Sequence, residues 1–174
     1  MLSPVVRSSM TFLLFSCLIL LAQVYGEDVR KERASVRSRC PQGSYSYFSY
    51  CYALYATPAT WMDAALNCQK QPSGYLTSVL SGSEASFVAS LIKTNFNNYK
   101  NIWIGLHDPT EGQQPNGGGW QWASTDVMNY QAWEVKPSPN SKAYCGTVSQ
   151  SSNYRKWREY NCDLMLPYVC KFKN

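Results

Sequence analysis

The chain has 174 residues, of which 45% are hydrophobic, 14% aromatic and 16% charged, so it is too apolar for a disordered protein and has the length of one globular domain with short accessory segments. Its formal net charge of +5 is far below the basic footprint of a nucleic-acid-binding protein. The chain has one histidine, His107, which is too few for a histidine-rich metal site or for several histidine-based acid–base pairs. This composition favours a binding protein over an enzyme.

The first residues have the order of a secretory signal peptide. Arg7 precedes an apolar run, Phe12–Ala22, and Val24-Tyr25-Gly26 follows at the place of the cleavage site. A membrane anchor is the alternative, but a bilayer-spanning helix needs about 20 apolar residues and this run is too short. We expect a signal peptide at 1–26 and a secreted, extracellular protein.

Residues 27–37 are charged and lack both aromatic side chains and periodicity. This composition predicts a flexible, trypsin-sensitive arm, with a plain solvated linker as the alternative. The segment holds three acids (Glu27, Asp28, Glu32) against four bases (Arg30, Lys31, Arg33, Arg37), so it cannot neutralise a basic domain.

Two helices are expected next. Thr60 and Asp63 have the spacing of an N-terminal cap, and Trp61, Ala65 and Cys68 follow on one face. Ser81 and Glu84 have the same spacing before a second helix that ends near Lys93. The buried stripe of this second helix is Phe87, Val88, Leu91 and Ile92.

Short β-type segments lie on both sides of these helices. A tyrosine-rich stretch between Cys40 and Cys51 indicates a stapled hairpin. After Asn95 the expected strands are Ile102–Leu106, Trp120–Trp122, Val127–Tyr130, Tyr144–Val148 and Tyr168–Phe172. No helix separates the later strands, so the pattern predicts an α+β domain with mostly antiparallel strands and long loops at 108–119 and 134–143.

Removal of the signal peptide leaves six cysteines, an even number in an oxidising compartment, which predicts three disulfides. Spacing alone leaves fifteen pairings open. Five tryptophans, at positions 61, 103, 120, 122 and 157, fall on the expected helix and strands or near them, which favours a role in the core over a role as sugar platforms.

The arrangement of these cysteines and tryptophans around Trp103-Ile104-Gly105-Leu106 resembles a long-form C-type lectin domain over residues 40–174. Three strings, at 40–44, 103–110 and 166–172, resemble the regenerating (Reg) proteins and most closely their Reg III group. The resemblance implies two helices, two mostly antiparallel sheets and the disulfides Cys40–Cys51, Cys68–Cys170 and Cys145–Cys162.

Sugar-binding C-type lectins usually hold calcium through two triplets, and both places differ here. The segment 134–140 lacks an acid at the first triplet, and the second reads Trp157-Arg158-Glu159-Tyr160-Asn161 before Cys162. An arginine beside the remaining carboxylate opposes a divalent cation. We expect no calcium or other metal site and no cofactor.

Reg III proteins resemble calcium-independent lectins that recognise peptidoglycan through a Glu-Pro-Asn triplet, which corresponds here to Gln114-Pro115-Asn116. Glutamine keeps an acceptor oxygen but loses the charge, and this loss would weaken binding about tenfold. A simple turn is an equal alternative for these residues, since proline and asparagine followed by glycine are typical of turns.

Some Reg III relatives are activated by trypsin near the N-terminus, and the matching bond here is Arg37–Ser38. The resemblance therefore implies a pro-segment at 27–37 and a C-type lectin-like domain at 38–174. Seven bases of the later half could meet an anionic bacterial membrane, with ordinary solvated surface as the commoner explanation: Lys136, Lys142, Arg155, Lys156, Arg158, Lys171 and Lys173. His107 beside Asp108 is the one hint of a catalytic base, and no free thiol or distinctive serine accompanies it.

The resemblance therefore implies a secreted, calcium-independent lectin that binds bacterial peptidoglycan or a related glycan, in antibacterial defence and the acute-phase, inflammatory response. The alternative is a trophic or regulatory signal that acts on a protein receptor at the surface of epithelial or islet cells. We expect no enzyme and no nucleic-acid partner.

Overall fold

The computed structural model describes residues 40–173 except 96–97, 111–118 and 139–140. The first half holds β1 (Ser44–Tyr47), β2 (Tyr50–Ala59), α2 (Trp61–Cys68), β3 (Tyr75–Leu76) and α3 (Gly82–Asn95). The second half holds β4 (Asn101–His107), β5 (Gln121–Trp122), β6 (Cys145–Ser149), the 3-10 helix η1 (Gln150–Ser152), β7 (Trp157–Tyr160) and β8 (Leu166–Phe172).

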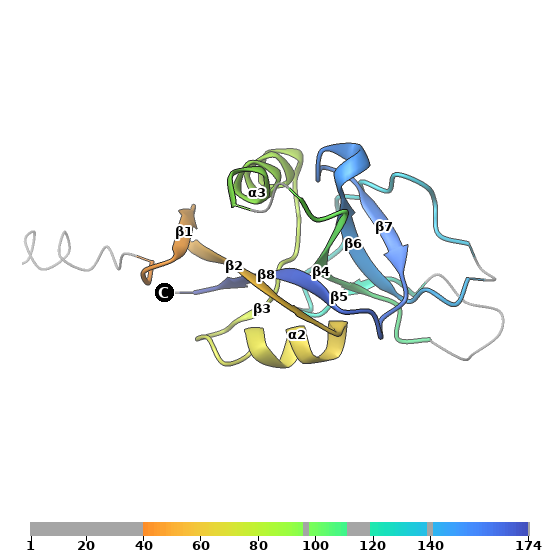
Figure 1. Ribbon diagram of the computed structural model, residues 1–174, viewed down its shortest axis with the longest axis horizontal. Helices are drawn as coiled ribbons and strands as arrows, with labels where there is room; N and C mark the ends of the chain where they lie inside the picture. Colours follow the sequence, from red (N-terminus) through yellow and green to blue (C-terminus); the bar gives the residue numbers. More distant parts are fainter. Residues whose placement is uncertain (1–39, 96–97, 111–118, 139–140, 174) are drawn as a thin grey trace, which may run out of the picture. The chain divides into compact units, whose positions relative to one another are not determined.

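The strands follow the order β1-β2-β8-β4-β6-β7, with β3 paired to β8 and β5 paired to β4. Two antiparallel groups, β1-β2-β8 and β4-β6-β7, meet at one parallel pair, Trp103 with Tyr168. The expectation of mostly antiparallel strands is therefore confirmed, but the two expected sheets are joined by the parallel contact into one eight-stranded sheet. Figure 1 shows α3 and α2 on opposite sides of the central strands.

The first helix forms as its sequence signals predict. The Thr60 hydroxyl oxygen accepts a hydrogen bond from the backbone N–H of Asp63 at 3.1 Å, which satisfies a donor that the first turn leaves without an intrahelical partner. Trp61, Ala65 and Cys68 are buried on one face. The predicted cap and inward face are both confirmed.

The second helix is capped as predicted and is longer than expected. The Ser81 hydroxyl accepts from the backbone N–H of Glu84 at 3.1 Å, and the helix continues past Lys93 to Asn95. Val88, Leu91 and Ile92 are buried, as predicted from their spacing. Phe87 is half-buried and stacks on Tyr47, with 4.5 Å between the ring centroids.

The prediction of a strand at Val127–Tyr130 is wrong. These residues have strand-type side chains but no strand pairs with them, and Val127 is 72% exposed. Two strands were not predicted. β3 has only two residues, which its pairing with β8 defines, and β7 reads Trp-Arg-Glu-Tyr, with two charged residues at its centre. Strand formation here depends on an available neighbour more than on propensity.

The core interpretation of the tryptophans is confirmed for Trp61, Trp103, Trp122 and Trp157, whose exposed fractions are 6% or less. Trp120 is half-buried and packs edge-to-face on Trp133 at 4.9 Å between centroids. Trp122 and Trp157 form a second edge-to-face pair at 5.1 Å. Such pairs bury large apolar areas and fix ring orientation, which suits a structural role.

All three disulfides have the expected pairing. Cys40–Cys51 staples the β1–β2 hairpin, Cys68–Cys170 joins α2 to β8, and Cys145–Cys162 joins the start of β6 to the segment after β7. Their Cα–Cα distances of 5.2–5.5 Å are ordinary for disulfides. The cross-links therefore hold the helix, the last strand and the later loops to one frame.

Candidate functional site

The segment that holds Gln114, Pro115 and Asn116 begins and ends at one place on the sheet. Pairing of His107 with Gln121 sets β4 and β5 side by side, and the backbone N–H of Asp108 donates to the carbonyl of Tyr144 at 2.8 Å. The Asp108 carboxylate accepts from both the backbone and the hydroxyl of Thr110, at 2.9 and 2.5 Å.

Gly119, on the return side of this segment, lies against the same carboxylate. A Cβ atom at Gly119 would stand 3.2 Å from Asp108 Oδ1, so the two ends of the segment converge on Asp108. Residues 114–116 themselves lie outside the described residues, as do Arg37 and Ser38. Loops whose ends meet on a rigid sheet commonly carry recognition residues.

The carboxylate of Glu134, the first residue of the segment 134–140, is already engaged by protein donors. Its oxygens accept from the Ser149 hydroxyl at 2.5 Å and the Ser151 hydroxyl at 2.8 Å, and the Arg158 guanidinium lies 3.3 Å away. The Ser149 hydrogen bond is the largest cause that lowers the pKa of Glu134 below its ordinary value, with Ser151 and Arg158 acting in the same direction.

Backbone pairing places Glu134 in this cluster. Its N–H donates to the carbonyl of Trp157 at 2.9 Å, and the N–H of Trp157 donates to the carbonyl of Ala132 at 2.7 Å. Arg158 follows Trp157 on β7 and therefore turns toward Glu134. Glu159, the next residue, lies on the other face of the strand, since side chains alternate along it. The sequence prediction that Arg158 opposes a cation at Glu159 missed this pairing with Glu134.

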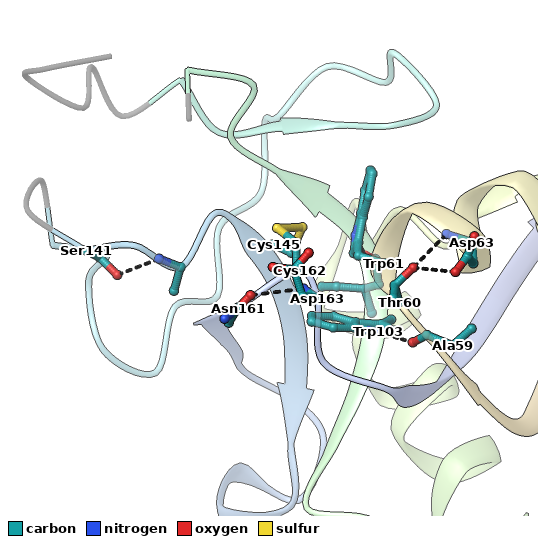
Figure 2. Close-up of a disulfide and its surroundings, with 12 residues drawn as sticks. Ala59, Thr60, Trp61, Asp63, Trp103, Ser141, Cys145, Asn161, Cys162 and Asp163 are labelled. Carbon is teal, nitrogen blue, oxygen red and sulfur yellow. Dashed lines mark hydrogen bonds between the residues drawn. A yellow bond between two sulfur atoms is a disulfide. The ribbon is translucent and has the colours of Figure 1, made fainter. Parts of the chain in front are cut away.

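The residues at the second calcium triplet of C-type lectins, 157–161 here, end in a polar turn beside a disulfide. Figure 2 shows Asn161 next to Cys145–Cys162, with its side-chain oxygen accepting from the backbone N–H of Asp163 at 3.0 Å. Within the described part of the chain, no three His, Cys, Asp or Glu residues come close enough together to hold a metal ion. The same part holds no helix long and apolar enough to cross a membrane.

The His107 ring is half-buried and packs against Trp61. Its imidazole lies 4.7 Å from the Trp61 ring, centroid to centroid, and burial lowers the pKa of His107 below its ordinary value. Lowering the pKa of a histidine favours the neutral form. The neighbouring Asp108 carboxylate turns to Thr110. Among the described residues, His107 Nδ1 and Asp108 Oδ2 are both buried without a hydrogen-bond partner, so no hydrogen bond joins the two side chains.

One predicted basic surface residue is not on the surface. Lys171 is 7% exposed, and its ammonium lies 2.7 Å from the Glu84 carboxylate. The expectation that Lys171 belongs to a basic patch is wrong, because β8 places it under α3. The other bases of that set are exposed on the described surface, and Arg158 carries the ion pair with Glu134.

Comparison with known proteins gives a consistent family. The family model described as Lectin C-type domain matches residues 57–172. Lithostathine from Bos taurus is 59% identical over 94% of both chains, and regenerating islet-derived protein 3-gamma from Homo sapiens is 57% identical over 100% of both. A solved structure of human lithostathine has a TM-score of 0.73 at 40% identity and covers 80% of this chain and 94% of the other.

Proposed function

Because the chain belongs to the Reg family of proteins with a C-type lectin domain, we propose that it is a secreted, calcium-independent lectin for bacterial cell-wall glycan. Its proposed roles are antibacterial defence and the acute-phase, inflammatory response. The proposed ligand is peptidoglycan or a related glycan, and the proposed contact is the segment Gln114-Pro115-Asn116. A signal peptide at 1–26, a pro-segment at 27–37 and cleavage at Arg37–Ser38 belong to the same proposal.

The observation that carries the proposal is the engagement of Glu134. Calcium prefers six to eight oxygen ligands, several of them carboxylates. Here the one carboxylate of the segment 134–140, that of Glu134, is held by Ser149, Ser151 and Arg158, and a guanidinium 3.3 Å away repels a divalent cation. This engagement of Glu134 supports sugar recognition without calcium, at another loop of the same domain.

The converging ends of 111–118 support that loop as the contact. Asp108, Thr110 and Gly119 fix the two points where the loop leaves and rejoins the sheet. Glutamine at position 114 offers a neutral acceptor where the relatives carry an acid, so the proposed affinity is lower by about tenfold than that of a glutamate-bearing site.

Sedimentation on insoluble peptidoglycan in EGTA tests this proposal. The full secreted chain, with and without residues 27–37, is compared with Gln114→Glu and Gln114→Ala variants. The proposal expects the wild type to pellet, soluble glycan to release it, Gln114→Glu to bind more tightly and Gln114→Ala to bind less.

The alternative function is a trophic signal that acts on a protein receptor of epithelial or islet cells, and the neutral Gln114 is the observation that favours it. It expects saturable binding to such cells that glycan does not compete. If only Gln114→Glu pellets, the glycan proposal for the wild type is overturned and the receptor function takes its place.

A further inference from the structure

A small cavity opens beside the end of β8, apart from the lectin loops. Its volume is about 200 Å³, and β2, β3, β8 and the loop after β5 contribute its walls. Figure 1 shows this end of β8 near β1 and β2, on the far side of the sheet from β7. The cavity is thus separate from the Glu134 cluster and from the ends of the 111–118 segment.

Charged and hydroxyl groups form the floor of this cavity. The Asp126 carboxylate accepts from the hydroxyl of Ser78 at 2.6 Å through its oxygen Oδ2. The Lys171 ammonium in turn donates to Ser78 at 3.2 Å and to Glu84 at 2.7 Å. Ser78 and Lys171 are buried, so this chain of hydrogen bonds is rigid and fixes the direction of the Asp126 carboxylate.

The second oxygen of Asp126, Oδ1, has no hydrogen-bond donor among the described residues, and a charged acceptor of this kind makes a strong bond to a hydroxyl. Ser124 adds a further hydroxyl, which donates to Oδ2 at 2.7 Å. The floor therefore presents one fixed, charged acceptor to whatever enters the cavity.

Two tyrosines and a lysine form the walls and the mouth. Strand β8 runs between β2 and β3, so Tyr50 and Tyr75 lie on either side of it. The Lys171 ammonium stands 4.6 Å from the centre of the Tyr50 ring, which fixes that ring. Lys173 is exposed and contributes a positive charge that, unlike Lys171, has no carboxylate pair in the described structure.

From this combination we infer that the cavity binds a single acidic sugar residue, a hexuronate, as a second glycan subsite. An aromatic wall packs against the C–H face of a sugar ring, and Asp126 accepts from its hydroxyls. The volume is below the 300–1,000 Å³ of drug-sized pockets, which favours a single small ring over a longer glycan. Lys173 at the mouth pairs with the sugar carboxylate and keeps it away from Asp126.

Amide NMR of the labelled full chain, titrated with D-glucuronate and with D-glucose as the matched neutral sugar, tests the inference. Glucuronate is expected to shift the amides of Tyr75, Ser78 and Lys173. Asp126→Asn should weaken D-glucose about tenfold, because a neutral acceptor replaces a charged one, and should weaken glucuronate by less, because the change also removes the repulsion between two carboxylates. Lys173→Ala should weaken glucuronate alone, to the level of glucose.

Matched controls separate this site from other surfaces. Asp163→Asn and Lys93→Ala change exposed residues outside the cavity and should leave both titrations unchanged. Gln114→Ala should also have no effect, so failure of the glycan proposal at residues 114–116 is distinguishable from failure here. Tyr75→Leu gives a second cavity variant should Asp126→Asn not fold.

If glucuronate causes no amide shifts, or if the shifts persist unchanged in both Asp126→Asn and Tyr75→Leu, the inference is overturned. Equal binding of glucose and glucuronate, with no effect of Lys173→Ala, would overturn the preference for an acidic sugar.

Discussion

The carboxylate of Glu84 and the ammonium of Lys171 form an ion pair in which both side chains are more than nine-tenths buried. Burial of two charges costs several kcal/mol per ion unless further hydrogen bonds compensate, and here they do. Glu84 also accepts from the Tyr52 hydroxyl at 2.5 Å and from the backbone N–H of Leu80 at 2.8 Å. Burial, followed by the Glu84 contact, raises the pKa of Tyr52 far above its ordinary value, so the hydroxyl remains a donor.

The pH dependence of folding stability tests the role of Glu134. Its folded pKa is lowered, so its ionised form adds stability that is complete above the unfolded pKa of about 4.3 and is lost as pH falls through the folded pKa. A Glu134→Gln variant should therefore be less stable at neutral pH and should lose less stability than the wild type on acidification below about pH 4.3. Urea unfolding across that range measures both quantities. Parallel stability curves for the two proteins would contradict this role of Glu134.

The centre of strand β4 accepts only glycine, at Gly105, because the backbone of β3 lies too close for a side chain. A Cβ atom there would stand 2.4 Å from the carbonyl oxygen of Leu76, closer than real contacts allow. The N–H of Gly105 donates to Thr77 at 2.9 Å and its carbonyl accepts from Ala123 at 2.7 Å. The glycine therefore permits close approach of β3 and the segment after β5 to β4.

We predict that Gly105→Ala lowers the free energy of unfolding by about 1–3 kcal/mol, the usual cost of forcing an extra methyl group into a packed site. Gly82→Ala is the matched control, because the nearest atom to its Cβ is the Tyr130 hydroxyl at 4.0 Å. Denaturant unfolding of both variants provides the measurement. Equal stability of the two variants would show that β4 moves freely and that the close approach carries no cost.

Local signals in the sequence predict the helices well, since Thr60 with Asp63 and Ser81 with Glu84 act over three residues. Strands depend on partners far along the chain, so Val127–Tyr130 was predicted and does not form, while β7 forms without a clear pattern. The cavity floor could not be predicted either: Ser78, Asp126 and Lys171 are brought together only by the topology. The sequence predicts Glu84 only as part of the helix cap, so its burial beside Lys171 could not be predicted.

At the scale of the whole molecule, the disulfides differ most in the length of chain that each closes. Cys68–Cys170 spans 102 residues, against 11 for Cys40–Cys51. The long bridge links α2 to β8, the strand that lies between β2 and β4 in the sheet. It therefore connects both antiparallel groups to the first helix, whereas the short bridge constrains a single hairpin.

Replacing both cysteines of Cys68–Cys170 by alanine should cost about 2 kcal/mol more stability than the same change at Cys40–Cys51, from the greater chain entropy of the longer loop. Urea unfolding of the two double variants, each with the other bridges intact, gives this difference. An equal loss in the two would mean that the bridges act through local packing and not through the unfolded chain.

We propose that this lectin domain binds bacterial glycan without calcium, and the engagement of the Glu134 carboxylate by Ser149, Ser151 and Arg158 supports the proposal. The most direct measurement is calorimetric titration of the full secreted chain with soluble peptidoglycan fragments, in EGTA and again in excess calcium. We expect the chain to bind the fragments with the same affinity in EGTA and in excess calcium. Binding that appears only with calcium would contradict it.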